Sequence, residues 1–82
     1  MKIEIMNKSL DYVKHYSYSV SYSTEDEAYI AECIELGIMA HGETQEEAIA
    51  EIKEATRVYL MMLEEDGEEV PLPLTLQNTK IS

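Results

Sequence analysis

Strict alternation marks the run Tyr16-Ser17-Tyr18-Ser19-Val20-Ser21-Tyr22-Ser23. Large side chains alternate with serine, and this period of two is typical of a β-strand with one buried face. The polar residues 24–27 separate it from a second apolar run, Ala28 to Ile34. We therefore predict an antiparallel hairpin in which both faces of the second strand are at least partly covered.

A third strand and a long helix are predicted next. Residues 38–41 make a short strand between Gly37 and Gly42, and Thr44-Gln45-Glu46-Glu47 matches the capping box that begins a helix. The helix extends from Gln45 to about Asp66, where Gly67 follows as a stop. Apolar side chains spaced by three and four form its core-facing stripe: Ala48, Ile49, Ile52, Ala55, Tyr59, Leu60 and Leu63.

The two ends of the chain are less regular. Pro71 and Pro73 exclude helix and central strand, and the residues Leu74-Thr75-Leu76 after them can add a short edge strand. Residues 7–14 can form a short helix, and residues 1–6 are either a strand or an extension. The predicted fold class is α+β, a three- to four-stranded antiparallel-rich sheet packed against one long helix. We expect one domain over 1–82, with its core at about 16–76 and an extension at 1–15.

Acidic residues dominate the middle of the chain. The net charge is −11, and residues 25–69 contain 15 of the 17 acids but only two bases, for a net of −13. Such a charge repels nucleic acid and anionic membranes and attracts a basic partner. Solubility is the alternative explanation of the same charge.

Catalytic and metal-binding patterns are weak. Cys33 is the single cysteine, which excludes an intramolecular disulfide, and His41 on a neighbouring strand is its one candidate partner for chemistry. The carboxylates fall in a predicted turn and on the outer side of the helix, so we predict no catalytic residues, no metal site and no cofactor. No signal peptide and no run of ~18 apolar residues is present, and we expect a cytoplasmic protein.

Residues 18–73 resemble the HicB family of type II toxin–antitoxin antitoxins. The resemblance depends on the strand pair, on Gly42-Glu43-Thr44-Gln45-Glu46-Glu47-Ala48 at the helix start, and on Asp66-Gly67-Glu68-Glu69-Val70-Pro71-Leu72-Pro73. It implies a β-β-β-α-β, partial ribonuclease H-like domain without enzymatic activity, which oligomerises and masks a small basic, mRNA-cleaving toxin of the HicA type. Members often add a C-terminal DNA-binding segment, whereas about nine residues follow Pro73 here, so we expect no direct binding of nucleic acid.

The leading hypothesis is therefore an antitoxin-like, non-catalytic protein-binding module. Its partner-binding residues are predicted to be Glu25, Asp26, Glu27 and Glu32, because they are acidic. Val58, Met61 and Met62 lie partly off the core stripe and are predicted to form a homo-oligomer interface, although scattered surface apolar residues are also ordinary. The alternative is a stand-alone homo-oligomeric structural domain without a toxin partner, and a metal-dependent nuclease is a third class.

Overall fold

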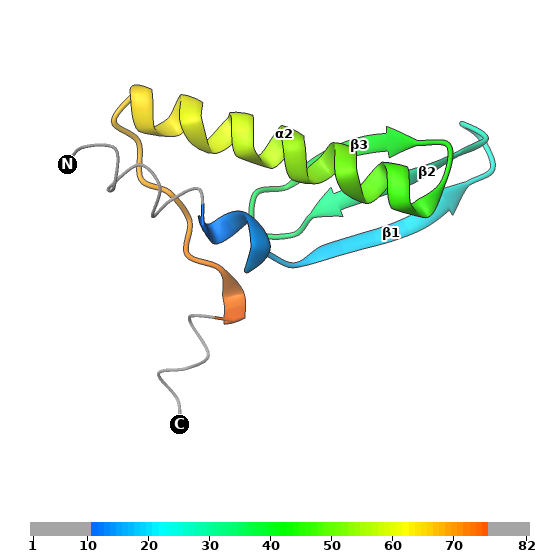
Figure 1. Ribbon diagram of the computed structural model, residues 1–82, viewed down its shortest axis with the longest axis horizontal. Helices are drawn as coiled ribbons and strands as arrows, with labels where there is room; N and C mark the ends of the chain where they lie inside the picture. The colour runs from blue at the N-terminus through cyan, green and yellow to red at the C-terminus, as the bar shows by residue number, and fades with distance from the viewer. Residues whose placement is uncertain (1–10, 76–82) are drawn as a thin grey trace.

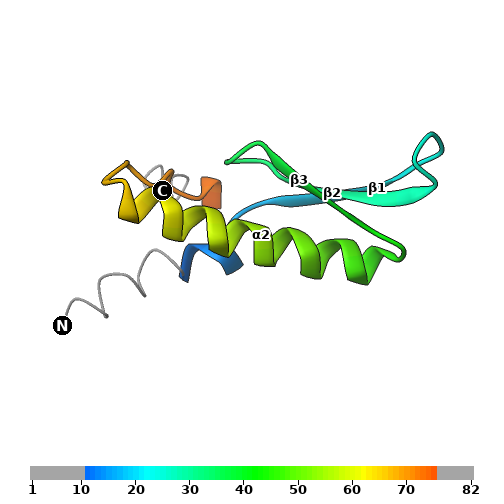
Figure 2. The same ribbon diagram turned by 90° about the horizontal axis from the view of Figure 1, so that it is seen from above.

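A three-stranded sheet and one long helix make up the protein. The computed structural model describes residues 11–75, which contain η1 (Asp11–Lys14), β1 (Tyr18–Ser23), β2 (Ala28–Cys33), β3 (Ile38–Gly42) and α2 (Gln45–Glu65) (Figure 1). The sheet has the order β1-β2-β3, and both strand pairs are antiparallel. Figure 2 shows α2 on one face of the sheet only. The predicted α+β class and the order β-β-β-α are confirmed.

The strand register places a continuous apolar surface under the helix. Val20 is paired with Ala31, and Ala31 with Ala40, so these three side chains lie on the same face. Ala31 and Cys33 of the central strand are fully buried there, together with Ala48, Ile52 and Leu60 of α2. Small side chains on β2 and β3 let the helix approach the sheet closely.

Both ends of α2 have the expected caps. Thr44 is the N-cap, and its Oγ1 accepts the N–H of Glu47 at 3.0 Å. The Glu47 carboxylate accepts the N–H of Glu43 at 2.6 Å, one residue before the position that a standard capping box uses. At the other end the N–H groups of Gly67 and Glu68 donate to Glu64 and Leu63, and Gly67 has a φ of 73°. This is a Schellman ending, which the predicted glycine stop required.

The buried stripe of α2 includes a polar residue that the sequence pattern did not predict. Ala48, Ile52 and Leu60 are fully buried as expected, but so is Thr56, and the other predicted stripe residues are half-buried. Thr56 lies four residues from both Ile52 and Leu60, so it shares their face of the helix. Its place on the helix, not its polarity, determines its burial.

The segment after α2 forms no fourth strand within the described residues. Leu74 and Thr75 are in a helical turn, and Leu76 lies outside the described residues. The Leu74 N–H donates to the Glu35 carboxylate at 3.0 Å, so it is not available to a strand. The segment is held by its own contacts: Pro73 is fully buried, and the Tyr16 hydroxyl donates to the Pro71 carbonyl at 2.7 Å.

The described part of the N-terminal segment packs on the same core. Residues 7–14 were predicted as a short helix, and Asp11–Lys14 form a 3₁₀ turn. Tyr12 and Val13 pack against the buried cluster, and the Tyr18 hydroxyl donates to the Val13 carbonyl. The predictions for residues 1–10 and 76–82 lie outside the described residues.

Candidate protein-binding surface

Six exposed carboxylates meet at one end of the molecule. The turn between β1 and β2 carries three of them, and the junction between β3 and α2 carries the others: Glu25, Asp26, Glu27, Glu43, Glu46 and Glu47. Both connections lie at the same end of the fold, on the right in Figure 1. We call this set the acidic end.

Local hydrogen bonds hold the turn that carries the first three acids. The Ser23 hydroxyl accepts the N–H of Asp26 at 3.2 Å and donates to its carboxylate at 3.3 Å. Glu27 has a φ of 52°, the left-handed conformation that closes the turn before β2 begins. All of the acids in this turn are exposed, so their charges project into solvent.

Close packing at Gly42 positions the other three acids. A Cβ at Gly42 would lie 2.3 Å from the backbone nitrogen of Ala48, so a larger residue would push the helix away from the strand. The first turn of α2 therefore begins directly against the end of β3. Glu46 and Glu47 lie in that first turn, where the positive end of the helix dipole favours negative charge.

His41 connects the two halves of the acidic end. Its Nε2 lies 3.9 Å from Oδ2 of Asp26, and both side chains are more than half exposed. An exposed pair at this distance contributes little to stability. Six exposed carboxylates and one histidine at this end leave a strongly negative potential, which attracts basic groups.

The predicted partner-binding residues separate into two places. Glu25, Asp26 and Glu27 belong to the acidic end, whereas Glu32 lies on the open sheet face toward the opposite end of β2, paired with Ser19 and Met39. Glu32 is four residues beyond Ala28, the first residue of β2, which places it about 13 Å further along the strand. The predicted set does not include Glu43, Glu46 and Glu47, which the fold brings to the same end.

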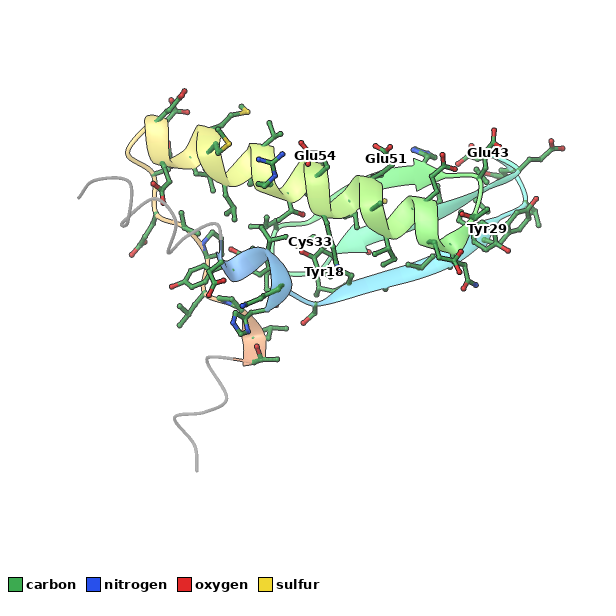
Figure 3. The ribbon with its side chains drawn as sticks, viewed as in Figure 1. Tyr18, Tyr29, Cys33, Glu43, Glu51 and Glu54 are labelled. Atoms are coloured by element: carbon green, nitrogen blue, oxygen red, sulfur yellow. The ribbon has the colours of Figure 1, made fainter. Side chains whose placement is uncertain are left out.

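The predicted oligomer residues form a patch on the outer side of α2. Val58, Met61 and Met62 are 45%, 38% and 54% exposed. Val58 follows Glu54 by four residues and Glu51 by seven, so the patch continues a line of acids along the helix. Figure 3 shows Glu51 and Glu54 pointing away from the sheet.

A second group of acids surrounds the C-terminal end of α2. Glu64 and Glu65 end the helix, Asp66, Glu68 and Glu69 follow, and the last turn has no basic residue. These charges meet the negative end of the helix dipole, where cations are favoured instead. We call these five residues the C-terminal acidic cluster.

Glu35 is the one acid of the β2–β3 turn, and it is engaged inside the fold. It accepts the Ser17 N–H at 2.9 and 3.1 Å, the Ser17 hydroxyl at 3.1 Å and the Leu74 N–H at 3.0 Å. Partial burial raises its pKa, but the hydrogen bonds from Leu74 and Ser17 outweigh this and hold the pKa below its usual value. Sequence reasoning missed this role because a glutamate in a turn is usually solvated.

Cys33 and His41, the one pair considered for chemistry, lie on opposite faces of the sheet. Cys33 is paired with Ile38 under α2, and His41 lies three positions further along β3, on the open face. Burial raises the pKa of the Cys33 thiol, so it is neutral near pH 7. Tyr18, its partner on β1, has a pKa raised to about 12 by the same burial. Figure 3 shows both side chains beneath the helix.

Metal sites and membrane-spanning helices are absent from residues 11–75. No group of three or more His, Cys, Asp or Glu side chains there is placed to hold a metal ion. In the same part of the chain, no helix combines the length and apolarity needed to cross a membrane. Comparison with known proteins gives no further guidance, because no protein-family model, curated protein or solved structure matches the chain.

Proposed function

We propose that this protein is an antitoxin-like, non-catalytic binding module of the HicB kind, which acts in the cytoplasm by masking a small basic toxin protein. The observation that carries the proposal is the acidic end, where six exposed carboxylates lie in two neighbouring connections of the fold. The β-β-β-α order supports it, because the resemblance of residues 18–73 implies that order.

The acidic end is suited to the first encounter with a basic surface. Its turn is held by hydrogen bonds and its helix begins at a capped N-terminus, so the carboxylates are presented on rigid elements. Complementary charge raises the rate and the specificity of association more than the final affinity. The acids therefore guide the partner, and apolar contacts nearby retain it.

Co-expression with each small basic protein encoded beside this gene tests the proposal. The expected result is a complex that co-purifies and that protects cells from the basic protein's toxicity. A neighbourhood without such a gene, or a neighbour that neither binds nor is neutralised, contradicts it.

Matched charge variants show whether the acidic end is the binding surface. The triple variant Glu25→Gln, Asp26→Asn, Glu27→Gln removes three charges there, and Glu64→Gln, Glu65→Gln, Asp66→Asn removes three from the C-terminal acidic cluster. We expect the first to slow association at least about tenfold and the second to change it much less. Equal effects would mean that net charge alone governs binding.

A stand-alone homo-oligomeric domain is the second candidate function. The exposed apolar patch Val58, Met61 and Met62 favours it, because three adjacent apolar side chains on one helix face suit a protein contact. Under this alternative the chain assembles with itself and neutralises no toxin. Protection of cells from a cognate toxin would exclude it.

A further inference from the structure

The outer edge of β1 has no partner strand among residues 11–75. In the order β1-β2-β3, the residues Tyr18–Ser23 pair with β2 on one side only. Figure 1 shows β1 along the lower border of the sheet, with no element beyond it over the length of the strand. An edge strand of this kind presents a row of backbone donors and acceptors to any strand that approaches.

This edge lacks the features that usually prevent pairing. Protected edges are short, bulged, or carry proline or charged side chains. β1 pairs one-to-one with β2 over six residues, so it has no bulge, and its sequence of Tyr, Ser and Val contains neither proline nor charge. The edge is therefore competent to pair.

The hydrogen-bond pattern shows which residues face outward. In an antiparallel pair, residues that exchange both backbone hydrogen bonds alternate with residues that exchange none. The Ile34 N–H donates to the Ser17 carbonyl at 2.8 Å, so Ser17 occupies a bonded position. Ser19, Ser21 and Ser23 consequently face β2. The N–H and C=O groups of three residues face the open edge: Tyr18, Val20 and Tyr22.

We propose that two copies of this chain pair antiparallel through their β1 edges, about a two-fold axis at Val20. Val20 then lies opposite Val20 of the second copy, and Tyr18 lies opposite Tyr22. Every outward backbone group of the three residues gains a partner in this register. The product is a six-stranded sheet with both α2 helices on the same face, since the axis is perpendicular to the sheet.

The other edge of the sheet, β3, offers fewer free backbone groups for pairing than β1 does. Cys33, Ala31 and Tyr29 direct their backbone groups toward β3, so Ile38, Ala40 and Gly42 are the bonded residues of β3. Only Met39 and His41 face outward, one residue fewer than on β1.

Charge identifies a second copy as a suitable occupant of the β1 edge. Two chains of net charge −11 repel at most surfaces, but no charged residue lies between Lys14 and Glu25. The register about Val20 also brings Glu25 and Asp26 of one copy toward η1 of the other, where Lys14 is paired with Asp11. The edge is thus the described surface at which like-charged copies meet with least repulsion.

The side chains along β1 add apolar area to the pairing. Tyr18, Val20 and Tyr22 lie on the helix-facing side, and Tyr22 is 53% exposed with its ring edge-on to Tyr29. A shallow hollow beside β1 is lined by Val20, Gln45, Glu46 and Ile49. Pairing places apolar side chains of the second copy against this hollow, and they are removed from water there.

Amide hydrogen exchange of the unmodified chain tests the pairing residue by residue. The N–H groups of Tyr18, Val20 and Tyr22 should exchange fast in dilute solution and at least about tenfold more slowly once dimers form. Those of Ser19, Ser21 and Ser23 are bonded to β2 and provide the internal control. If the three outward amides remain unprotected in a solution that light scattering shows to be dimeric, the edge is not the interface.

Cysteine cross-linking tests the register. Opposed residues in a bonded antiparallel pair have Cα atoms about 5.5 Å apart, within the range of a disulfide. Val20→Cys should therefore cross-link readily on oxidation. Ser21→Cys, which has no opposed copy of itself, and Met62→Cys, on the outer side of α2, should not. Native Cys33 is fully buried, so the unmodified chain should not cross-link and serves as the negative control. Fast cross-linking of Met62→Cys alone would assign the interface to α2 instead.

A proline variant tests the contribution of one outward N–H. Val20→Pro removes that group and leaves the bonds from Ser19 and Ser21 to β2 in place. We expect the dimer dissociation constant to rise at least about tenfold, with the far-ultraviolet circular dichroism of the monomer unchanged. The proposal would be overturned if Val20→Pro dimerised as tightly as the wild type. It would also be overturned if the wild-type chain remained a 9.4 kDa monomer at all concentrations. No basic partner is needed, so this result is separate from the test of the proposed function.

Discussion

At the scale of single residues, Glu35 joins three parts of the chain that are distant in sequence. Its carboxylate accepts hydrogen bonds from Ser17 before β1 and from Leu74 after α2. One side chain thus fixes the start of the sheet, the β2–β3 turn and the C-terminal segment together. Hydrogen bonds to an ionised acceptor are stronger than neutral ones, so the charge itself matters here.

Replacing Glu35 with glutamine should destabilise the protein at neutral pH and much less in acid. The folded chain holds the Glu35 pKa below its usual value, so the ionised form contributes stability above the unfolded pKa. That contribution is lost as the pH falls through the folded pKa. We expect Glu35→Gln to cost about 1–3 kcal/mol near pH 7. Urea unfolding across pH measures this, with exposed Glu51→Gln as the control; a cost independent of pH would contradict the role of the charge.

Thr56 presents the opposite case, a buried polar group that contributes little. Its side chain is fully buried next to the Tyr18 hydroxyl and the Cys33 thiol, and its own hydroxyl makes no hydrogen bond of normal geometry within the described residues. Valine has nearly the same shape without the hydroxyl. We expect Thr56→Val to raise the free energy of unfolding by about 1 kcal/mol, because a buried unpaired hydroxyl is removed. A loss of stability on thermal unfolding would show that the hydroxyl has a partner.

At the scale of elements, the junction of β3 and α2 depends on a missing side chain. The backbone of Ala48 occupies the space that a Cβ on Gly42 requires. This contact sets where the helix begins relative to the sheet. It therefore also sets where Glu43, Glu46 and Glu47 lie.

Gly42→Ala should destabilise the protein by about 1–3 kcal/mol, because the added carbon forces the helix and the strand apart. Gly67→Ala is the matched control: it has open space around it but a φ of 73°, so its cost is conformational only, about 1 kcal/mol. Urea unfolding compares the two. If Gly42→Ala costs no more than Gly67→Ala, the close contact is not a constraint on the fold.

Most of the elements follow from periodicity in the sequence. The alternation of residues 16–23 predicted β1, and the capping box with Gly67 predicted both ends of α2 within one residue. Local patterns do not show which segments meet across the fold. The burial of Thr56 depends on its place above the sheet, and the path of residues 70–75 depends on Tyr16 and Glu35. For this reason the edge strand considered at Leu74 was wrong.

The acidic end, which is the proposed binding surface, was predictable from the sequence only in part. Glu25, Asp26 and Glu27 are consecutive, so their grouping is visible in the sequence. Their meeting with Glu43, Glu46 and Glu47 is produced by the antiparallel register, which returns β3 to the end of the sheet where the first turn lies. Glu32 has the same charge but lies on another face, since alternate strand residues point to opposite sides.

At the scale of the whole molecule, charge is concentrated at the two ends of α2. The acidic end surrounds its N-terminus and the C-terminal acidic cluster follows its last turn, while β1 carries no charge. The two proposals therefore use different surfaces: the acidic end for a basic partner and the β1 edge for a second copy of the chain. The β1 edge of the proposed dimer uses backbone groups of Tyr18, Val20 and Tyr22, and of the acidic end only Glu25 and Asp26 approach the second copy in that register.

Salt should separate guidance by the acids from retention in the complex. Raising the ionic strength shortens the Debye length from ~10 Å at 0.1 M to ~3 Å at 1 M. We expect the association rate with a basic partner to fall over this range and the dissociation rate to change little, since buried contacts are screened less. Stopped-flow kinetics measures both rates. A salt-independent association rate would show that the acidity serves solubility rather than recognition.

The return of the C-terminal segment to Tyr16 has a consequence for synthesis of the chain on the ribosome. A nascent polypeptide that has emerged only through α2 contains every strand, yet the Tyr16 hydroxyl still lacks Pro71, and Glu35 still lacks Leu74. The sheet and helix can associate at that stage, but the end of the core near Tyr16 stays open to water. Closure waits until residues 70–75 have emerged from the ribosome, so the nascent domain exposes an apolar opening that chaperones can recognise until then.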